Sequence, residues 1–308
     1  MGGFFGATSR RNCILDVFFG TDYHSHLGTR RGGMAAWDKD VGMQREIHNI
    51  ENSPFRTKFE GILGEMKGCA AIGCISDTDP QPILIRSRLG IYAICTIGVI
   101  NNAETLIANH LHSTGGHFDS MTGGRVNSNE LIAAMIDQKE DFAQGIRYAQ
   151  DRIEGTASIL IMKEGGNLIA ARDKMGRLPI VIEKNEDGYA VTFEDYAGEK
   201  LGYEVVRELG PGEIVEISPD GITQLAPPHK EMKVCAFLWS YYGYPTACYE
   251  GKNVEVTRYR NGCIMAKADR ENGVAQDIDY VAGVPDSGTP PISSFSELER
   301  EKFKNLQP

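Results

Sequence analysis

Short apolar segments separated by tight turns fill the second half of the chain and limit its fold more than any other feature. These segments are 158–162, 168–172, 180–183, 189–193 and 214–217. Turn-forming sequences lie between them, such as Glu164-Gly165-Gly166-Asn167. Short apolar runs punctuated by Gly, Asp and Asn are typical of antiparallel hairpins. The sequence therefore predicts a run of antiparallel strands in this half.

The first half mixes strands with helices. Gly3 to Ala7 is an apolar segment at the very N-terminus, and 70–75 and 92–97 are strand candidates of the buried kind. Apolar residues at helical spacing predict helices over 55–66, from about Asn102, from Asn127 with Glu130 completing a capping box, and over 142–153. Strands, then helices, then strands again favour an α+β fold in which sheets lie between helix layers.

A domain boundary is predicted near residue 230, where Pro227-Pro228-His229-Lys230 interrupts the pattern. The predicted domains are 1–230 and 231–308. In the second, a helix is expected from about Val254 to Asp269, and 279–285 is expected to be a buried strand opening an α/β unit.

Charge and cysteine content exclude several classes of protein. The formal charge of −10 disfavours nucleic acid or an anionic membrane as partner. No segment reaches the roughly 18 apolar residues of a membrane helix, and Asp16 interrupts the apolar run after Arg10-Arg11 too early for an export signal. The seven cysteines include no CxxC pair, so a cytoplasmic protein with free thiols is expected.

Several motifs occur in a characteristic order. They are Gln81-Pro82, the segment 98–103, the segment Arg172-Asp173-Lys174-Met175-Gly176-Arg177-Leu178-Pro179, the segment 209–213 and the segment Val284-Pro285-Asp286-Ser287-Gly288-Thr289-Pro290. In this order they resemble the class II glutamine amidotransferases, and most closely the amidophosphoribosyltransferases. The resemblance implies a four-layer αββα sandwich of the N-terminal-nucleophile hydrolase type through about residue 230. It also implies the start of an incomplete α/β phosphoribosyltransferase-type domain, because no phosphoribosyl pyrophosphate loop follows Pro290.

The resemblance also implies a set of site residues. In that family an N-terminal Cys attacks the glutamine amide, with its own α-amino group as general base. An Asn side chain and a Gly backbone N–H form the oxyanion hole, and an Arg and an Asp hold the glutamine carboxylate and amino group. Here the matching positions are Gly2 for the nucleophile, Ile97 and Gly98 for the oxyanion hole, and Ser76 and Ser128 for the glutamine-binding Arg and Asp. Gly2, Ile97, Ser76 and Ser128 all lack the required groups, so the chain is predicted not to hydrolyse glutamine.

Two further sites suggested by the sequence are interpreted as structural. Cys235 matches one iron–sulfur ligand of some family members, but its partner ligands would lie beyond residue 308, so no cofactor is expected. His24 and His26 alternate as if on one face of a strand and could bind a metal. His26 and Gly28 instead match a turn of the family, which favours a structural role, and no metal site is predicted.

Three functional hypotheses follow. The leading one is an inactive amidotransferase-like scaffold or regulatory module that binds a small-molecule amide or an amino acid and forms a homo-oligomer. The alternative is a working amidotransferase or amidohydrolase of the purine-biosynthesis type whose native residue 2 is Cys, acting on glutamine or on a modified substrate. A metal or redox protein built on the thiols is the third, and the absence of ligand spacing makes it the weakest.

Overall fold

The computed structural model describes residues 2–273, 282–283 and 287–288. The chain divides into two compact units, the first ending at Val234 and the second beginning at Cys235. None of the helices within the described residues combines the length and the apolar character that crossing a membrane requires.

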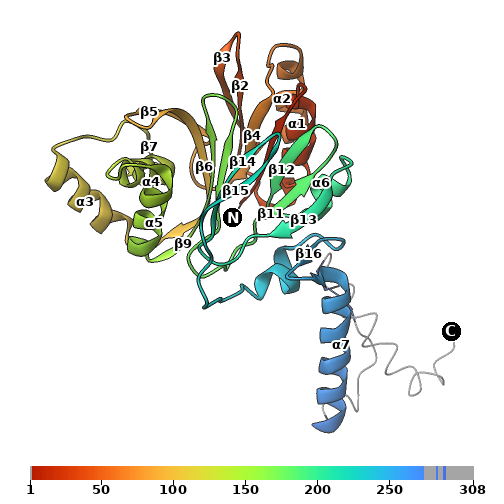
Figure 1. The fold of residues 1–308 in the computed structure, drawn as a ribbon. Helices are drawn as coiled ribbons and strands as arrows, with labels where there is room; N and C mark the ends of the chain where they lie inside the picture. The colour runs from red at the N-terminus through yellow and green to blue at the C-terminus, as the bar shows by residue number, and fades with distance from the viewer. Residues whose placement is uncertain (1, 274–281, 284–286, 289–308) are drawn as a thin grey trace. The chain divides into compact units, whose positions relative to one another are not determined.

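The N-terminal strand lies in the middle of the first sheet (Figure 1). The sheet has seven strands in the order β13-β11-β12-β1-β4-β2-β3, and all its neighbours pair antiparallel. Their bounds are β1 Gly2–Ser9, β2 Arg31–Asp38, β3 Gly42–Asn49, β4 Ala70–Ser76, β11 Val181–Lys184, β12 Gly188–Thr192 and β13 Glu204–Glu208. Every residue of β1 is buried, because β4 and β12 flank it and other layers cover its two faces.

The second sheet has six strands in the order β15-β14-β10-β9-β6-β5. Their bounds are β5 Ile83–Ser87, β6 Gly90–Ile100, β9 Gly155–Lys163, β10 Leu168–Ala171, β14 Ile214–Ser218 and β15 Gly221–Ala226. The five strands predicted between residues 158 and 217 are all present, but they are shared between the two sheets. Turn residues specify which neighbours pair as hairpins, and they carry no information on the sheet that a hairpin joins.

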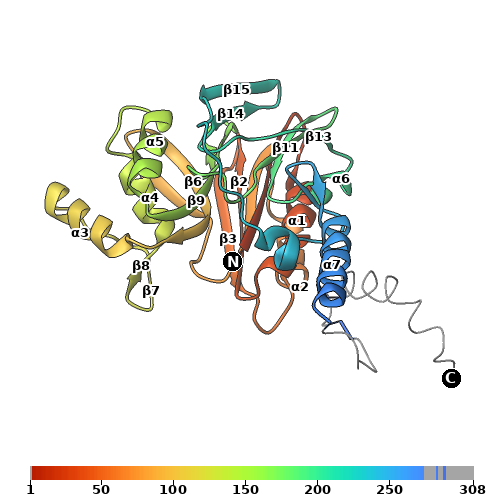
Figure 2. The ribbon, with the colours of Figure 1, turned by 90° about the horizontal axis from the view of Figure 1, so that it is seen from below.

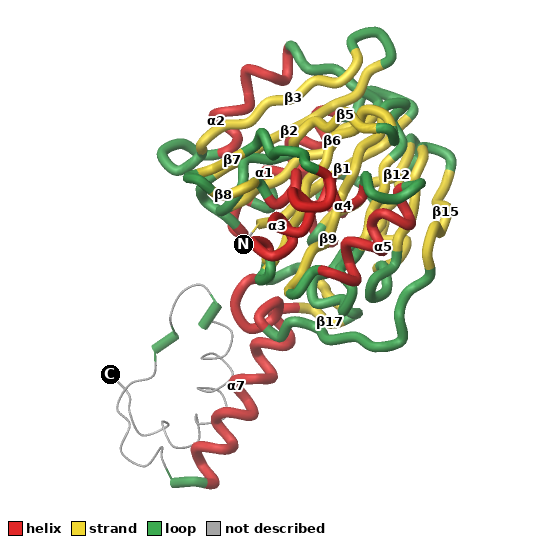
Figure 3. Tube along the Cα trace, turned by 90° about the vertical axis from the view of Figure 1, so that its left-hand side faces the viewer, coloured by secondary structure: helices red, strands yellow, loops and turns green. Residues whose placement is uncertain are grey.

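Helices cover the outer faces of both sheets (Figures 1 and 3). On the first sheet, α1 (Ile14–Asp22) and α2 (Phe55–Phe59) contribute Val17, Phe18 and Phe55 to a core that includes Phe5 of β1. On the second, α4 (Ser128–Ile136) and α5 (Phe142–Arg152) pack Ile132 and Ile146 on the strands. Each such buried side chain contributes roughly 1.5–3 kcal/mol relative to an exposed one. The order is therefore helix, sheet, sheet, helix, and the predicted α+β class with stacked sheets is confirmed.

Figure 2 shows the same two groups of helices on opposite sides of the stacked sheets when the first unit is seen from below. The remaining helix of the middle segment, α3 (Ala103–Thr114), packs on α4 through a small cluster containing Leu106, Leu131 and Met135. The predicted helices from about Asn102, from Asn127 and over 142–153 correspond to α3, α4 and α5.

Two local predictions were wrong in part. The helix expected over 55–66 ends at Phe59 and continues as a 3₁₀ segment, η2 (Glu60–Gly64), because Gly61 and Gly64 weaken an α-helix. The capping box at Asn127 is only half formed. The Asn127 side chain accepts from the Asn129 N–H at 2.9 Å, whereas the carboxylate of Glu130 accepts from the backbone N–H groups of Asp119 and Ser120 at 2.9 and 2.7 Å. Beside this contact, β7 (Met121–Thr122) and β8 (Arg125–Val126) form a small hairpin.

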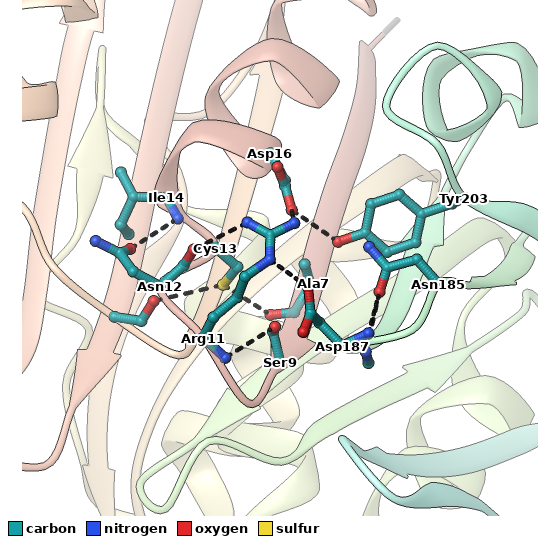
Figure 4. A network of polar contacts seen from close by, with 12 residues as sticks. Ala7, Ser9, Arg11, Asn12, Cys13, Ile14, Asp16, Asn185, Asp187 and Tyr203 are labelled. Atoms are coloured by element: carbon teal, nitrogen blue, oxygen red, sulfur yellow. Dashed lines mark hydrogen bonds and ion pairs between the residues drawn. The ribbon is translucent and has the colours of Figure 1, made fainter.

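A charged network fixes the turn from β1 into α1 (Figure 4). The Arg11 guanidinium lies between two carboxylates, with Nε 2.5 Å from Asp187 Oδ2 and Nη2 3.2 Å from Asp16 Oδ2. The Tyr203 hydroxyl donates to the same oxygen of Asp16 at 2.9 Å. The Asn12 side chain accepts from the Ile14 N–H at 3.1 Å and so satisfies the first N–H group of α1. The network joins α1 to the turn between β11 and β12, which carries Asp187, and to Tyr203, which directly precedes β13. It lies at the opposite end of β1 from Gly2.

One carboxyl group is buried in the first sheet without a partner. Glu183 of β11 has no exposed surface, and neither carboxyl oxygen has a hydrogen-bond partner. Its side chain lies against Gly198 of α6 (Asp195–Glu199), where a Cβ would overlap the carboxyl. Burial raises the pKa of Glu183 to about 9, and the negative charges of Asp195 and Glu199 add to this effect. The group is therefore a neutral carboxylic acid at pH 7.

The second unit is built around one long helix. It contains a π-helical turn, η3 (Leu238–Tyr242), the short strands β16 (Cys248–Tyr249) and β17 (Lys252–Asn253), and α7 (Val254–Glu271). The buried Arg258 of α7 donates to the carbonyls of Trp239, Tyr241 and Gly243 and so holds η3 on the helix. The helix predicted from about Val254 is thus present. Most of the strand predicted over 279–285 lies outside the described residues, and residues 282–283, which are described, belong to neither a helix nor a strand.

Candidate functional site

Gly2 lies at the start of β1, on a backbone with no room for a side chain. Its Cα pairs with that of Ser76 in β4. A Cβ at Gly2 would overlap the carbonyl oxygen of Ile75 and would lie 3.2 Å from Cδ1 of Ile97. Real Cβ atoms do not approach a backbone oxygen this closely, so a larger residue here requires the two strands to move. The structure therefore brings together three of the predicted positions, Gly2, Ser76 and Ile97.

Ile97 belongs to the second sheet, and its side chain covers the end of β1 at which Gly2 lies. It lies in β6, is 3% exposed, and its Cα pairs with that of Ser158 in β9, while Gly98 pairs with Ala157. An isoleucine side chain has no hydrogen-bonding group. The side chain nearest to Gly2 in this direction is therefore apolar, and it can neither stabilise a negative charge nor bind an amide.

Ser76 is buried and engaged by its own loop. Its hydroxyl accepts a hydrogen bond from the backbone N–H of Thr78 at 3.2 Å and lies 3.4 Å from the Thr78 hydroxyl. The position carries no positive charge. The neighbouring charge is instead negative, because Asp77 follows directly and its carboxylate accepts from the Thr29 N–H at 2.8 Å.

Ser128 begins α4 and reaches the same loop from the other side. Its backbone N–H donates to Asp79 Oδ2 at 3.2 Å, and Asn127 Nδ2 donates to the Pro80 carbonyl at 2.8 Å. The Asp79 carboxylate thus lies at the N-terminus of α4, where a negative charge is stabilised by the helix dipole. The loop 77–81 therefore connects the Ser76 and Ser128 positions.

Gln81 fastens this loop to β6. Its buried side-chain amide donates to the Thr96 carbonyl at 3.1 Å and accepts from the Thr96 N–H at 2.8 Å, so it pairs with the backbone as a strand would. Thr96 directly precedes Ile97. From the sequence, Gln81 was identified only as part of the Gln81-Pro82 motif, and its role in fastening the loop was missed. The sequence gives little sign of it, because Gln81 follows the polar segment 76–79 and only the residues after Pro82 are apolar.

His24 lies beneath the first residues of β1. Its side chain is fully buried next to Gly3, Nδ1 lies 2.7 Å from the Gly20 carbonyl, and Nε2 lies 3.3 Å from the Glu194 N–H. Burial lowers the pKa of His24 to about 4, against the opposing effect of the nearby Glu194 carboxylate. His26 Nε2 lies 2.8 Å from Glu194 Oε2. Both histidines belong to the turn around η1 (Ser25–Leu27), so their predicted alternation on a strand was wrong.

The thiols nearest the site are buried and unreactive in character. Cys74 has no exposed surface, and its Sγ lies 3.3 Å from the Gln81 carbonyl oxygen. Burial raises the pKa of the Cys74 thiol well above its ordinary value, and a hydrogen bond with the Cys95 thiol raises it further. A thiol of this kind carries almost no thiolate at pH 7 and is a poor nucleophile. Within the part of the chain that the structure describes, no group of three or more His, Cys, Asp or Glu residues could hold a metal ion.

The motif at 172–179 is structural. The buried Arg172 guanidinium donates to the carbonyls of Leu178, Leu209 and Gly176 at 2.9, 2.5 and 2.7 Å. The Asp173 carboxylate accepts from the backbone N–H groups of Met175 and Leu178 at 3.1 and 3.2 Å. The two charged residues therefore shape the turn from the second sheet back to the first.

Comparison with known proteins agrees with this architecture. A family model described as "Glutamine amidotransferase domain" matches residues 69–195. An amidophosphoribosyltransferase of Methanocaldococcus jannaschii is 28% identical, over 96% of this chain and 66% of its own length. The amidophosphoribosyltransferase of Bacillus subtilis is 26% identical, over 96% of this chain and 61% of its own length. The chain thus spans less than two thirds of the length of these relatives.

Solved structures match over a similar range. Glutamine phosphoribosylpyrophosphate amidotransferase from B. subtilis, complexed with ADP and GMP, has a TM-score of 0.83 and 25% identity and is matched over 96% of this chain and 63% of that one. A structure of the allosteric regulatory enzyme of purine biosynthesis has the same TM-score at 24% identity and shows the fold alone. The resemblance inferred from the sequence is confirmed: residues 69–195 match the glutamine amidotransferase domain model, and the relatives found over most of the chain are amidophosphoribosyltransferases.

Proposed function

We propose that this chain is an amidophosphoribosyltransferase-like protein whose glutamine amidotransferase domain does not hydrolyse glutamine. The observation that carries the proposal is the backbone contact at Gly2. Glycine supplies no nucleophile, and the Ile75 carbonyl oxygen occupies the space that a Cβ would need. Without a nucleophile, the covalent route through an acyl-enzyme is closed.

The other positions support the same proposal independently of Gly2. Ile97 stands where the family has an oxyanion-hole Asn, and loss of one such donor costs roughly 10²–10³ in rate. Ser76 and Ser128 replace the charged groups that hold free glutamine, and the charges gathered in the loop are the carboxylates of Asp77 and Asp79. This arrangement favours a ligand other than glutamine.

The proposal extends to the fold type of each part of the chain. The helix, sheet, sheet, helix order supports an N-terminal-nucleophile hydrolase type of sandwich for the first unit. The 96% coverage supports a phosphoribosyltransferase-type beginning for the residues after about 230. In this role the domain would serve as a scaffold or regulatory module for a small-molecule amide or amino-acid ligand, in a homo-oligomer. Apolar side chains exposed on α7, such as Ile264 at 67% and Met265 at 58%, favour self-association.

A second candidate is a working amidotransferase whose native residue 2 is Cys. The buried thiol of Cys74, whose pKa is raised well above its ordinary value, is a poor substitute nucleophile, so this candidate function requires Cys at position 2 itself. The close contact with Ile75 argues against it, since a Cys there would have to push β1 away from β4.

The test is a glutaminase assay on the wild-type chain beside the Gly2→Cys and Gly2→Cys/Ile97→Asn variants. Removal of the initiator Met is verified by mass spectrometry in each, and the B. subtilis relative serves as positive control. We expect no glutamate from any of the three chains. Glutamate from the Gly2→Cys chain would show that Ser76, Ile97 and Ser128 do not disable the site. Glutamate from the wild-type chain would overturn the proposal.

A further inference from the structure

We propose that residues 227–233, here called the linker strap, form a pH-sensitive clasp on the first unit that Arg147 holds closed while His229 is neutral. The strap is the last segment of the first unit and leads directly to Cys235, where the second unit begins. The proposal is independent of whether the amidotransferase site is active.

Two backbone hydrogen bonds hold the strap against two turns of the first unit. The His229 N–H donates to the Pro211 carbonyl at 2.7 Å, and the Lys233 N–H donates to the Met175 carbonyl at 2.8 Å. The imidazole of His229 packs directly on Gly212, where a Cβ would overlap the ring. Met232 is half-buried beside Gly176 and Pro228 lies against Gly210, while the other side chains of the strap are exposed.

Arg147 of α5 is the side chain that closes the clasp. Its Nη2 donates to the Pro227 carbonyl at 3.0 Å, and its Nη1 lies 2.5 Å from Nε2 of His229. Nη1 also donates to Gln150 Oε1 at 3.1 Å, and the buried Gln150 is itself fixed by donating to the Arg172 carbonyl at 2.8 Å. The guanidinium is therefore held in place before the strap arrives.

The contact between Arg147 and His229 requires a neutral imidazole. An arginine keeps its proton at any physiological pH and can only donate. Nε2 of His229 must then accept, and Nδ1 must carry the proton. A protonated His229 would present an N–H to another N–H and place a positive charge against the guanidinium.

The charges around His229 make it harder to protonate. Burial lowers the pKa of His229 first, and the positive charges of Arg147 and Lys174 lower it further, while Asp151 acts in the opposite direction. Asp151 is already paired with Lys174 at 2.9 Å, and Glu213, near Pro228, is paired with Arg207 at 2.9 Å. Within the strap, Lys230 adds a positive charge, and Lys233 lies 3.5 Å from Glu231.

The sign of the pH dependence follows from this. A histidine whose pKa is lowered in the closed state stabilises that state above its ordinary pKa of 6.5, and the stabilisation is lost as the pH falls below that value. The strap should then detach from the two turns that it crosses. The last residue hydrogen-bonded to the rest of the first unit would then lie at the end of β15 and no longer at Lys233. The tether to the second unit is longer by the length of the strap.

Hydrogen exchange of the full chain at pH 5 and pH 7, corrected for intrinsic exchange rates, tests the proposal. We expect the protection of the His229 and Lys233 amides to fall about threefold to tenfold at pH 5. In a His229→Gln variant, whose side-chain oxygen accepts at either pH, protection should be the same at both. The amides of β14 serve as the internal control for global unfolding.

The outcomes separate clearly. Equal protection of the strap at pH 5 and pH 7 in the wild-type chain would overturn the proposal, and so would an equal fall in the His229→Gln variant. A second measurement follows the His229 imidazole by NMR titration in the wild-type chain and in Arg147→Ala. We expect the pKa of His229 to rise in the variant, and an unchanged pKa would show that Arg147 does not hold the ring.

Discussion

At the scale of single residues, two groups whose pKa shifts strongly on folding are buried near the first sheet. His24 is kept neutral by burial beside β1, and Glu183 is kept protonated by burial against α6. His24 lies next to Gly3 of β1, and Glu183 lies against Gly198 of α6. The shifted pKa of each group makes the stability of the fold depend on pH.

Glu183 gives a pH-dependent prediction. Its folded-state pKa lies above the ordinary value, so the folded chain holds a proton that the unfolded chain has released, and stability falls as the pH rises from 4.5 towards 9. The loss attributable to this group is about 3 kcal/mol between pH 5 and pH 7. Glu183→Gln, which is neutral at both values, should remove most of it.

The measurement is the free energy of unfolding in urea at pH 5, 7 and 8 for the wild-type chain and the variant. Glu164→Gln, an exposed turn residue, is the matched control and should change neither value. Identical pH profiles for the wild type and Glu183→Gln would show that the carboxyl is already ionised, contrary to the structure.

At single positions, one part of the candidate site could be predicted from the sequence and another part could not. The substitutions at Gly2, Ser76, Ile97 and Ser128 are visible in the sequence through the family resemblance. The overlap between a Cβ at Gly2 and the Ile75 carbonyl is not visible, because it depends on how closely two backbones approach. A sequence specifies which side chains are absent, and only coordinates show whether their space is still open.

At the scale of elements, turn chemistry made the hairpins of the second half predictable, while β2 and β3 were missed. β2 carries Gly32, Gly33, Ala35 and Ala36, which have low strand propensity, and β3 is polar along much of its length. They form a hairpin because β4 pairs with β2 over its length. Such a strand is specified by its neighbour in the sheet, and its own sequence carries little signal.

Arg172 gives a prediction at this scale, because it joins three segments. Arg172→Ala would leave the carbonyls of Gly176, Leu178 and Leu209 without this donor, and each buried unsatisfied group costs about 1–3 kcal/mol. We expect a loss of about 3–5 kcal/mol in the free energy of unfolding. Arg88→Ala, at an arginine 48% exposed, should cost less than about 1 kcal/mol. Equal losses for the two variants would contradict a structural role for the 172–179 motif.

At the scale of the whole molecule, the first unit contains the hydrophobic clusters of both sheets, which involve residues from Phe5 to Ala226. Residues 1–234 should therefore fold without the second unit and keep a cooperative thermal transition within about 5 °C of the first transition of the full chain. Circular dichroism and calorimetry on the two chains test this. A fragment without a cooperative transition would show that the second unit is required for the fold.

The central position of β1 has a consequence for synthesis. This strand is synthesised before both of its partners, and β12, the later of the two, begins only at Gly188. At about 5–20 residues per second, the partner appears roughly 10–40 s later. For that time an apolar strand must wait without the neighbour that completes its pairing, at a stage when other nascent chains are close by. The demand of this fold on chaperones should therefore be greatest in the interval between synthesis of β1 and synthesis of β12, while a strand that is fully buried in the finished fold is still incompletely paired.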